Sequence, residues 1–146
     1  MTIKIAIASD HAGFALKQQL KKSFTAVPVE WFDLGAYSSD SVDYPDFGKK
    51  VADAVAGGEA PLGIAICGSG IGISIACNRN PNIRAAVCTD ATMARLTRQH
   101  NDANILCLGE RLTGVEVALD IVKTFLETKF DGGERHERRV AKLSSC

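Results

Sequence analysis

The sequence lacks an excess of either charge, a long apolar run and the basic-then-apolar start of a secretory leader. Lysine plus arginine number 17 and aspartate plus glutamate number 17, so the formal net charge is zero. Nucleic-acid binders normally show a basic excess, so we expect no nucleic-acid partner. No apolar run approaches the roughly 18 residues of a membrane span. We therefore expect no membrane partner and a cytoplasmic location.

The sequence also lacks cysteines and histidines paired at the spacings typical of metal ligands. The five cysteines include no C-x-x-C pair, and the three histidines are scattered along the chain. Paired cysteines and clustered histidines are the usual mark of a zinc site, so we expect no metal and no cofactor. Unpaired cysteines in a cytoplasmic protein are expected to stay reduced.

Short apolar runs alternate with amphipathic segments along the whole chain. We predict strands over residues 3–8, 29–34, 62–66, 83–87 and 104–108. We predict helices over 14–24, 47–56, 71–77, 92–100, 115–129 and 134–143, with Asp43-Tyr44-Pro45 as the start of the second. Such alternation is typical of βαβ units and a parallel sheet, and 146 residues suit one domain. The prediction is a single α/β domain over residues 1–146. It has a three-layer αβα, Rossmann-like fold with a five-stranded parallel sheet and a C-terminal helix.

Residues capable of chemistry follow three of the five predicted strands. In open parallel sheets, ligands bind beyond the carboxyl ends of the strands. Those ends carry Asp10 and His11, the loop 67–72, and Arg111. We therefore expect the functional site at this edge of the sheet.

The most specific motif is Cys67-Gly68-Ser69-Gly70-Ile71-Gly72, directly after the third strand. Alternating glycines let backbone N–H groups face an anion at a helix N-terminus. A dinucleotide loop would read G-x-G-x-x-G after the first strand, although Asp90 lies about 20 residues on and keeps a nicotinamide-dependent enzyme open. A P-loop lysine is absent, and Ile73 stands where a C-x5-R phosphatase needs arginine. The remaining interpretation is a loop for a developing oxyanion beside a cysteine.

Cys67 is the one cysteine with a functional interpretation. A thiol beside a helix N-terminus loses its proton more readily, and the thiolate is the reactive form. Cys77 and Cys107 fall inside a predicted helix and a predicted strand, and Cys88 directly follows a strand, so we expect small buried side chains at all three. Cys146 is expected to be an exposed thiol of the tail.

His11, His100 and the late arginines each have two interpretations from pattern alone. His100 ends a predicted helix, where a histidine often serves as a C-cap, and His11 is equally ambiguous. Arg135 and Arg139 are spaced i,i+4 and share a helical face. That spacing suits either a solvated helix or an anion site.

Five segments resemble one family when they are taken together. They are Asp10-His11-Ala-Gly, Asp43-Tyr44-Pro45, Cys67-Gly-Ser-Gly-Ile-Gly-Ile-Ser, Arg98-Gln-His100-Asn101-Asp-Ala-Asn and Arg135-His136-x-x-Arg139. Their order and their coverage of nearly the whole chain resemble the type B ribose-5-phosphate isomerases, a family that includes subunits of galactose-6-phosphate isomerase. The resemblance implies interconversion of ribose 5-phosphate and ribulose 5-phosphate through a cis-enediolate.

The resemblance also implies roles for individual residues. Cys67 would be the catalytic base with Ser69 beside it, and His100 would open the sugar ring with help from Asp10. Contacts to substrate and phosphate are implied for a larger set: His11, Tyr44, Gly68, Gly70, Ile71, Gly72, Asn101, Arg111, Arg135 and Arg139. One branch of the family uses a glutamate at the position of Ile73, so this chain resembles the branch that uses cysteine.

The implied assembly is a homodimer or a dimer of dimers, in which the terminal arginines complete the neighbour's site. The same chemistry on a six-carbon substrate, such as allose 6-phosphate or galactose 6-phosphate, is an alternative, because the sequence does not show pocket length. A non-catalytic nucleotide-binding α/β domain is another. Such a domain would keep the loop but would need neither Cys67 nor His100.

Overall fold

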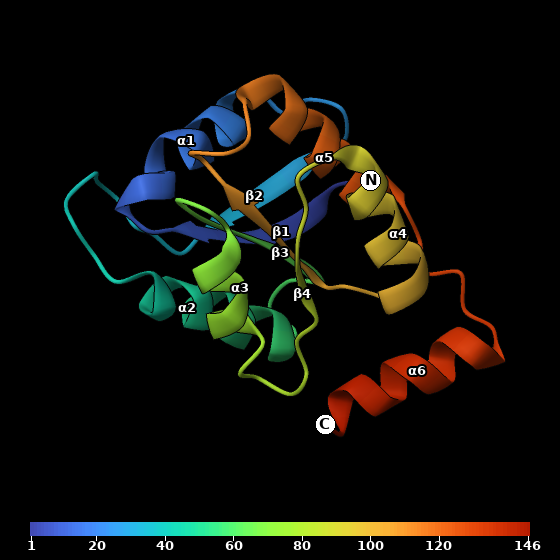
Figure 1. The fold of residues 1–146 in the computed structure, drawn as a ribbon. Helices are drawn as coiled ribbons and strands as arrows, with labels where there is room; N and C mark the ends of the chain where they lie inside the picture. The colour runs from blue at the N-terminus through green and yellow to red at the C-terminus, as the bar shows by residue number, and fades with distance from the viewer.

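The computed structural model describes all 146 residues. Its five strands form one parallel sheet and are β1 (Ile3–Ser9), β2 (Val29–Asp33), β3 (Leu62–Cys67), β4 (Ala85–Val87) and β5 (Ile105–Gly109). Their order across the sheet is β2-β1-β3-β5-β4 (Figure 1). β3 and β5 are buried along their whole length, whereas the edge strands β2 and β4 are largely half-buried.

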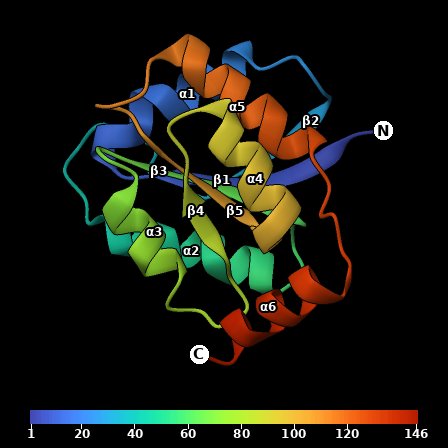
Figure 2. The ribbon, with the colours of Figure 1, turned by 45° about the vertical axis from the view of Figure 1, so that its right-hand side comes forward.

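Helices cover both faces of the sheet. α1 (Phe14–Ser23), α4 (Ala91–Asn101) and α5 (Val115–Glu127) lie over one face, and α2 (Tyr44–Ala56) and α3 (Ile71–Cys77) lie over the other (Figures 1 and 2). Side chains of β1 alternate between two cores, Ile5 and Ile7 on the α1 side and Ala6 and Ala8 on the α2 side. The predicted three-layer α/β fold is therefore confirmed.

Most boundaries differ from the sequence prediction by one or two residues. The second helix begins at Tyr44, as the Asp43-Tyr44-Pro45 start predicts, because Pro45 lies in its first turn, where a missing N–H costs nothing. The fourth strand begins only at Ala85, since the Arg84 amide donates to the side chain of Asn104 instead of joining the sheet. No helix of the structure combines the length and the apolar character needed to cross a bilayer.

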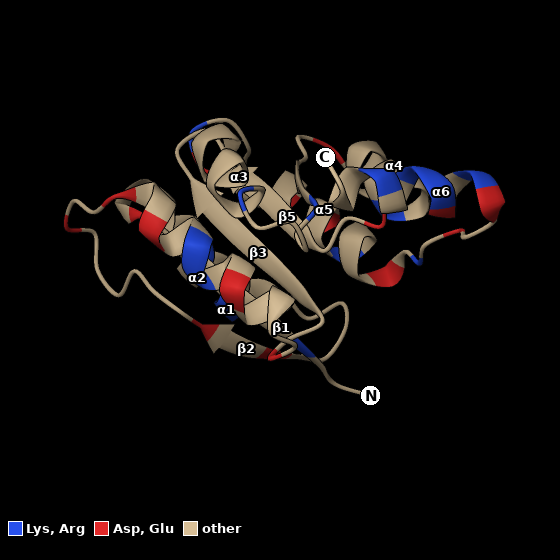
Figure 3. Cartoon of the chain, turned by 90° about the horizontal axis from the view of Figure 1, so that it is seen from below, with Lys and Arg blue, Asp and Glu red and all other residues tan.

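The predicted C-terminal helix is α6 (Glu134–Ser144), and it lies outside the three layers. It sits beside the end of α4 and has no buried residue (Figure 2). Basic positions occur along the ribbon of α6 where it passes α4 (Figure 3). The helix therefore has exposed basic surface that the rest of the chain does not cover.

A buried lysine fixes the chain between β2 and α2. Lys17 of α1 is fully buried, and its Nζ donates to Asp33 Oδ1 at 2.8 Å and to the carbonyl of Ala36. Burial lowers the pKa of Lys17, and the hydrogen bond to Asp33 opposes that shift. This contact fastens the carboxyl end of β2 to α1, and so directs the following segment toward Tyr44.

The register of the central strands brings three chain segments to one edge of the sheet. Ser9 pairs with Ile66, and Cys67 pairs with Gly109. Asp10, the loop after Cys67 and Arg111 therefore all begin at the carboxyl edge. His100 instead lies in the last turn of α4, just before β5 begins, and so belongs to the amino edge.

Candidate active site

The loop after β3 fixes the position of the Cys67 thiol. Cys67 is the last residue of β3, is 4% exposed, and its Sγ accepts a hydrogen bond from the Gly70 amide at 3.2 Å. Gly70 has a φ of +79°, and a Cβ there would lie 2.9 Å from the carbonyl carbon of Leu108. Both constraints require glycine. The backbone of the loop thus holds the sulfur at the carboxyl edge.

The amides of the loop divide into those bonded within the chain and those left open. The Gly70 amide donates to Cys67 Sγ, and the Ile71 amide donates to Ser69 Oγ at 3.1 Å. The amides of Gly68 and Ser69, before α3, and the amide of Gly72, in its first turn, have no acceptor within the chain. The structure therefore leaves the Gly68 and Ser69 amides available beside the thiol and uses those of Gly70 and Ile71 internally.

His11 is held by a backbone donor from a distant segment. The Val42 amide donates to His11 Nδ1 at 3.1 Å, so in the neutral ring the proton resides on Nε2. The neighbouring Asp10 is buried, and its Oδ1 accepts from the Gly13 amide at 3.0 Å, which caps the short helical turn His11–Gly13. His11 therefore offers an N–H to a ligand.

These segments enclose a cleft of about 470 Å³, which we call the thiol cleft. Arg111 lies against the glycine-rich loop, because a Cβ on Gly68 would lie 3.1 Å from its Nη1. Tyr44 packs on Gly72 in the same way, because a Cβ on Gly72 would lie 2.7 Å from Cε1 of the tyrosine ring. Predicted site residues that line the cleft are Asp10, His11, Tyr44, Cys67, Gly68, Ser69, Gly72 and Arg111.

Four predicted site residues belong to α4 and α6, and three of them line a different cleft. His100, Asn101 and Arg139 line a hollow of about 350 Å³ together with His136, and we call it the histidine cleft. The rings of His100 and His136 stack with centroids 4.7 Å apart. Arg135 Nη2 lies 3.4 Å from His136 Nε2. The pKa of His136 is lowered, mainly by loss of solvent around its ring and secondly by the positive charge of Arg135.

The two clefts lie at opposite edges of the sheet. Residue 105, at the start of β5, pairs with Gly63, and Gly109, at its end, pairs with Cys67. Four residue steps along a strand span roughly 13 Å. One chain therefore does not bring His100 to Cys67. Asp10, which the resemblance paired with His100, lies with Cys67 instead.

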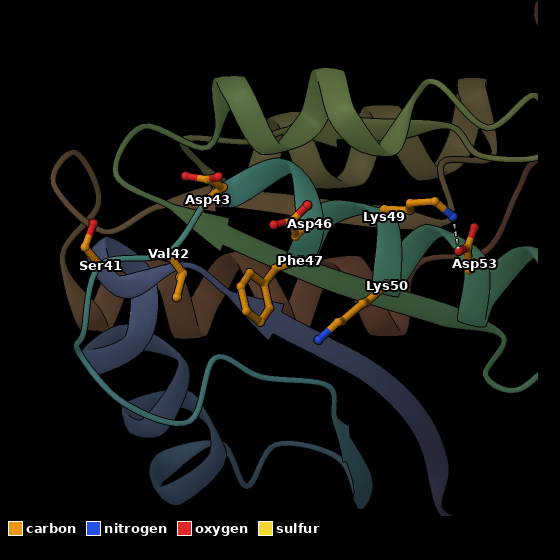
Figure 4. Close-up of a pocket in the computed structure, with 8 residues that line it drawn as sticks. All are labelled: Ser41, Val42, Asp43, Asp46, Phe47, Lys49, Lys50 and Asp53. Atoms are coloured by element: carbon orange, nitrogen blue, oxygen red, sulfur yellow. Dashed lines mark hydrogen bonds and ion pairs between the residues drawn. The ribbon is translucent and has the colours of Figure 1, made fainter.

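Cleft size alone does not identify a site in this protein. A larger hollow of about 730 Å³ runs along α2, and Figure 4 shows its lining. It contains neither cysteine nor histidine, and its Lys49 and Asp53 pair with each other at 2.6 Å. Its charged side chains are all exposed, whereas the loop thiol and the histidines lie elsewhere.

Comparison with known proteins identifies the family of the chain. A family model described as Ribose/Galactose Isomerase matches residues 5–143. The chain belongs to the ribose/galactose isomerase family. The resemblance found in the sequence motifs is thereby confirmed.

Several members of the ribose/galactose isomerase family resemble the chain along nearly its whole length. Ribose-5-phosphate isomerase B of Escherichia coli is 46% identical over 142 residues, which are 97% of this chain and 95% of that protein. The structure of ribose-5-phosphate isomerase B from Clostridium thermocellum shares 55% identity with a TM-score of 0.94, covering 98% of this chain and 96% of that one. The type B ribose 5-phosphate isomerase of Trypanosoma brucei shares 48% identity with a TM-score of 0.95, covering 99% of each chain.

Sequence reasoning missed some residues of the two clefts in this ribose/galactose isomerase. Ala12 and Leu112 line the thiol cleft, and Val140 and Leu143 line the histidine cleft. Ala12 and Leu112 stand beside predicted site residues, so proximity in sequence could have indicated them. Nothing in the sequence indicated that the Val42 amide would orient His11.

The remaining cysteines behave as predicted in burial. Cys77, Cys88 and Cys107 are buried, Cys146 is exposed, and all five thiols are free. Burial, followed by the charge of Asp90, raises the pKa of Cys88 to about 12. A hydrogen bond with Cys77, followed by burial, raises the pKa of Cys107 well above its usual range.

We predict that alkylation of the folded protein at pH 8 modifies Cys67 and Cys146 and spares Cys77, Cys88 and Cys107. A pKa of about 12 leaves roughly one thiolate in 10⁴ at that pH, and only thiolates react. Peptide mass mapping after iodoacetamide treatment measures this, with the urea-unfolded protein as the control in which all five react. Labelling of Cys88 or Cys107 in the folded protein would contradict the burial described here.

Proposed function

We propose that the protein interconverts ribose 5-phosphate and ribulose 5-phosphate by proton transfer between C1 and C2 through a cis-enediolate. The observation that carries this proposal is the thiol of Cys67 held beside two available loop amides in a chain of this family. The proton on a carbon next to a carbonyl is weakly acidic, so its removal needs a positioned base and donors for the resulting oxyanion. Cys67 supplies the first, and Gly68 and Ser69 supply the second.

Each proton that moves in the proposed reaction can be assigned to a group of the loop. The Cys67 thiolate removes the proton from C2 of the open-chain aldose and returns it to C1. The developing charge on oxygen is stabilised by the Gly68 and Ser69 amides, where one donor is worth about 10²–10³ in rate. A proton must also pass from O2 to O1, and the Ser69 hydroxyl is placed at the loop to exchange it. Each proton that leaves one atom is thereby received by another.

Groups outside the loop would bind the ends of the substrate. The guanidinium of Arg111 and the Nε2–H of His11 line the thiol cleft and can donate to sugar or phosphate oxygens. Arg135 and Arg139 carry the planar forks that suit a phosphate dianion. His100 can exchange protons with the ring oxygen and the O1 hydroxyl during ring opening, and Asn101 would contact a hydroxyl beside it.

We also propose that the working unit is a homodimer in which the thiol cleft of one copy faces the histidine cleft of the other. The geometry supports this, because one chain holds the two groups of residues at opposite edges of its sheet. A two-fold dimer would place two identical composite sites across its axis. Asp10 of one copy would then lie beside His100 of the second, as the sequence resemblance implied. A dimer of dimers is compatible with the same contact.

Exposed apolar side chains support an interface on the β4 side of the sheet. Ile71 and Ile75 of α3 are 54% and 51% exposed, and Met93 and Leu96 of α4 are 42% and 39% exposed. These two helices flank the half-buried edge strand β4 (Figure 2). A monomer would leave this apolar surface in water.

Five free thiols also fit the cytoplasmic location that we propose.

Turnover by the chelator-treated protein tests the proposed reaction. We expect the protein to convert ribose 5-phosphate after EDTA treatment. In the Cys67→Ala variant we expect kcat to fall by about 10²–10⁴-fold, with substrate binding largely retained. Cys146→Ala is the matched control and should keep full activity. Allose 6-phosphate and galactose 6-phosphate belong in the same assay, since preference for either would shift the proposal to a six-carbon substrate. Near-normal turnover by Cys67→Ala would remove the thiol from the mechanism.

Substitution of Ile75 by aspartate tests the proposed interface. A charge at the centre of an apolar contact should dissociate the dimer, because burying an unpaired carboxylate is costly. We expect a monomer by light scattering, an unchanged circular dichroism spectrum and loss of turnover. Val117→Asp, at a similarly exposed apolar position on α5, should change neither mass nor turnover. A dimeric, active Ile75→Asp variant would place the interface elsewhere.

A further inference from the structure

We propose that His100, Asp131 and His136 form a binding site for a divalent transition-metal ion such as Zn²⁺, and that occupation of this site inhibits the enzyme. Each of the three side chains offers one ligand atom, and these atoms lie within 4.8 Å of one another. Zinc takes imidazole nitrogen and carboxylate oxygen at about 2.0–2.2 Å, with water as a common fourth ligand. The lone pairs of two parallel imidazole rings do not converge on one point, so the rings of His100 and His136 must rotate out of their stack to bind one ion.

The backbone already holds these three ligands near one another. His100 lies in the last turn of α4, and the Asp131 amide donates to the carbonyl of Gln99 at 3.1 Å. The segment before α6 is therefore fastened to the turn that carries His100. His136 follows in the first turn of α6, and its ring stacks on that of His100 within 4° of parallel.

Charges around the cluster both favour and oppose a cation. The Asp131 carboxylate and the negative end of the α4 dipole favour it. Arg135 and Arg139 oppose it, and Arg135 must leave His136 Nε2 if the metal uses that nitrogen. That contact is long, at 3.4 Å, and lies at the surface, so its loss costs little. We therefore expect a site of moderate affinity.

The inhibitory part of this inference rests on the proposed function. A metal on His100 would occupy the nitrogen lone pair that accepts a proton during ring opening, and the ion would also attract the substrate phosphate away from its arginines. Asp131 has no part in the proposed catalysis. Its replacement should therefore remove the metal sensitivity without removing the activity.

Metal binding is measured first, on protein that cannot turn over substrate. Titration of the Cys67→Ala/Cys146→Ser variant with Zn²⁺, and with Co²⁺ as a visible-absorbing probe, excludes binding by the thiol that lines the thiol cleft and by the exposed thiol of the tail. We expect Asp131→Asn and His136→Gln in this background to weaken binding at least about tenfold, since even groups behind the ligands contribute about 10–100-fold. Asp120→Asn on α5 is the matched control and should bind as the parent does. Equal affinity in Asp131→Asn and its parent would overturn the site.

Inhibition is measured next, on the enzyme with all its cysteines. Zn²⁺ should inhibit ribose 5-phosphate turnover, whereas Asp131→Asn should keep the basal rate and need at least about tenfold more Zn²⁺. Equal inhibition of both proteins would overturn the inhibitory role. If no sugar phosphate is turned over at all, the proposed function fails, and the binding titration still decides the metal site.

Discussion

All five strands of the sheet run in the same direction, and this polarity determines where each functional residue can lie. Each helix that connects two strands must return the chain from the carboxyl edge to the amino edge before the next strand begins. A residue that ends a strand, such as Cys67, and a residue that ends a returning helix, such as His100, are therefore separated by the length of a strand. The homodimer that we propose answers this constraint, because a second copy can bring the two residues together.

The glycine-rich loop meets a second, more local constraint. It must hold a thiol, leave two amides open and turn into α3 within a few residues, and the left-handed conformation of Gly70 makes this possible. The carbonyls of Cys67 and Gly68 accept from the amides of Glu110 and Arg111, so the loop and the Arg111 segment are fixed as one unit. The Glu110 carboxylate in turn accepts from the Leu16 amide at 2.6 Å, which connects α1 to the same unit. Preorganised donors of this kind need little rearrangement when charge develops.

The sequence predicted the fold well because apolar periodicity and glycine positions are local signals. Cys67, the loop and Arg111 could be placed together for the same reason, since strand ends meet at one edge of a parallel sheet. The separation of His100 from Asp10 follows from the predicted order of elements, since His100 ends a helix before the fifth strand and Asp10 follows the first, but the motif resemblance alone does not indicate it. The Val42 contact to His11 joins positions 31 residues apart through backbone geometry, and Asp131 meets two histidines through the turn before α6. Such contacts depend on tertiary packing that no short pattern encodes.

The composite site is tested most directly by mixing two inactive variants. Cys67→Ala damages one half-site and His100→Asn damages the other, so each homodimer should be nearly inactive. After dissociation and reassociation at equal concentrations, half of the dimers should be hybrids, each with one intact and one doubly damaged site. Activity should then return to about a quarter of the wild-type level, as random pairing in a two-fold dimer requires. If mass spectrometry of differently tagged chains demonstrates exchange and no activity returns, Cys67 and His100 do not act in one site across two copies.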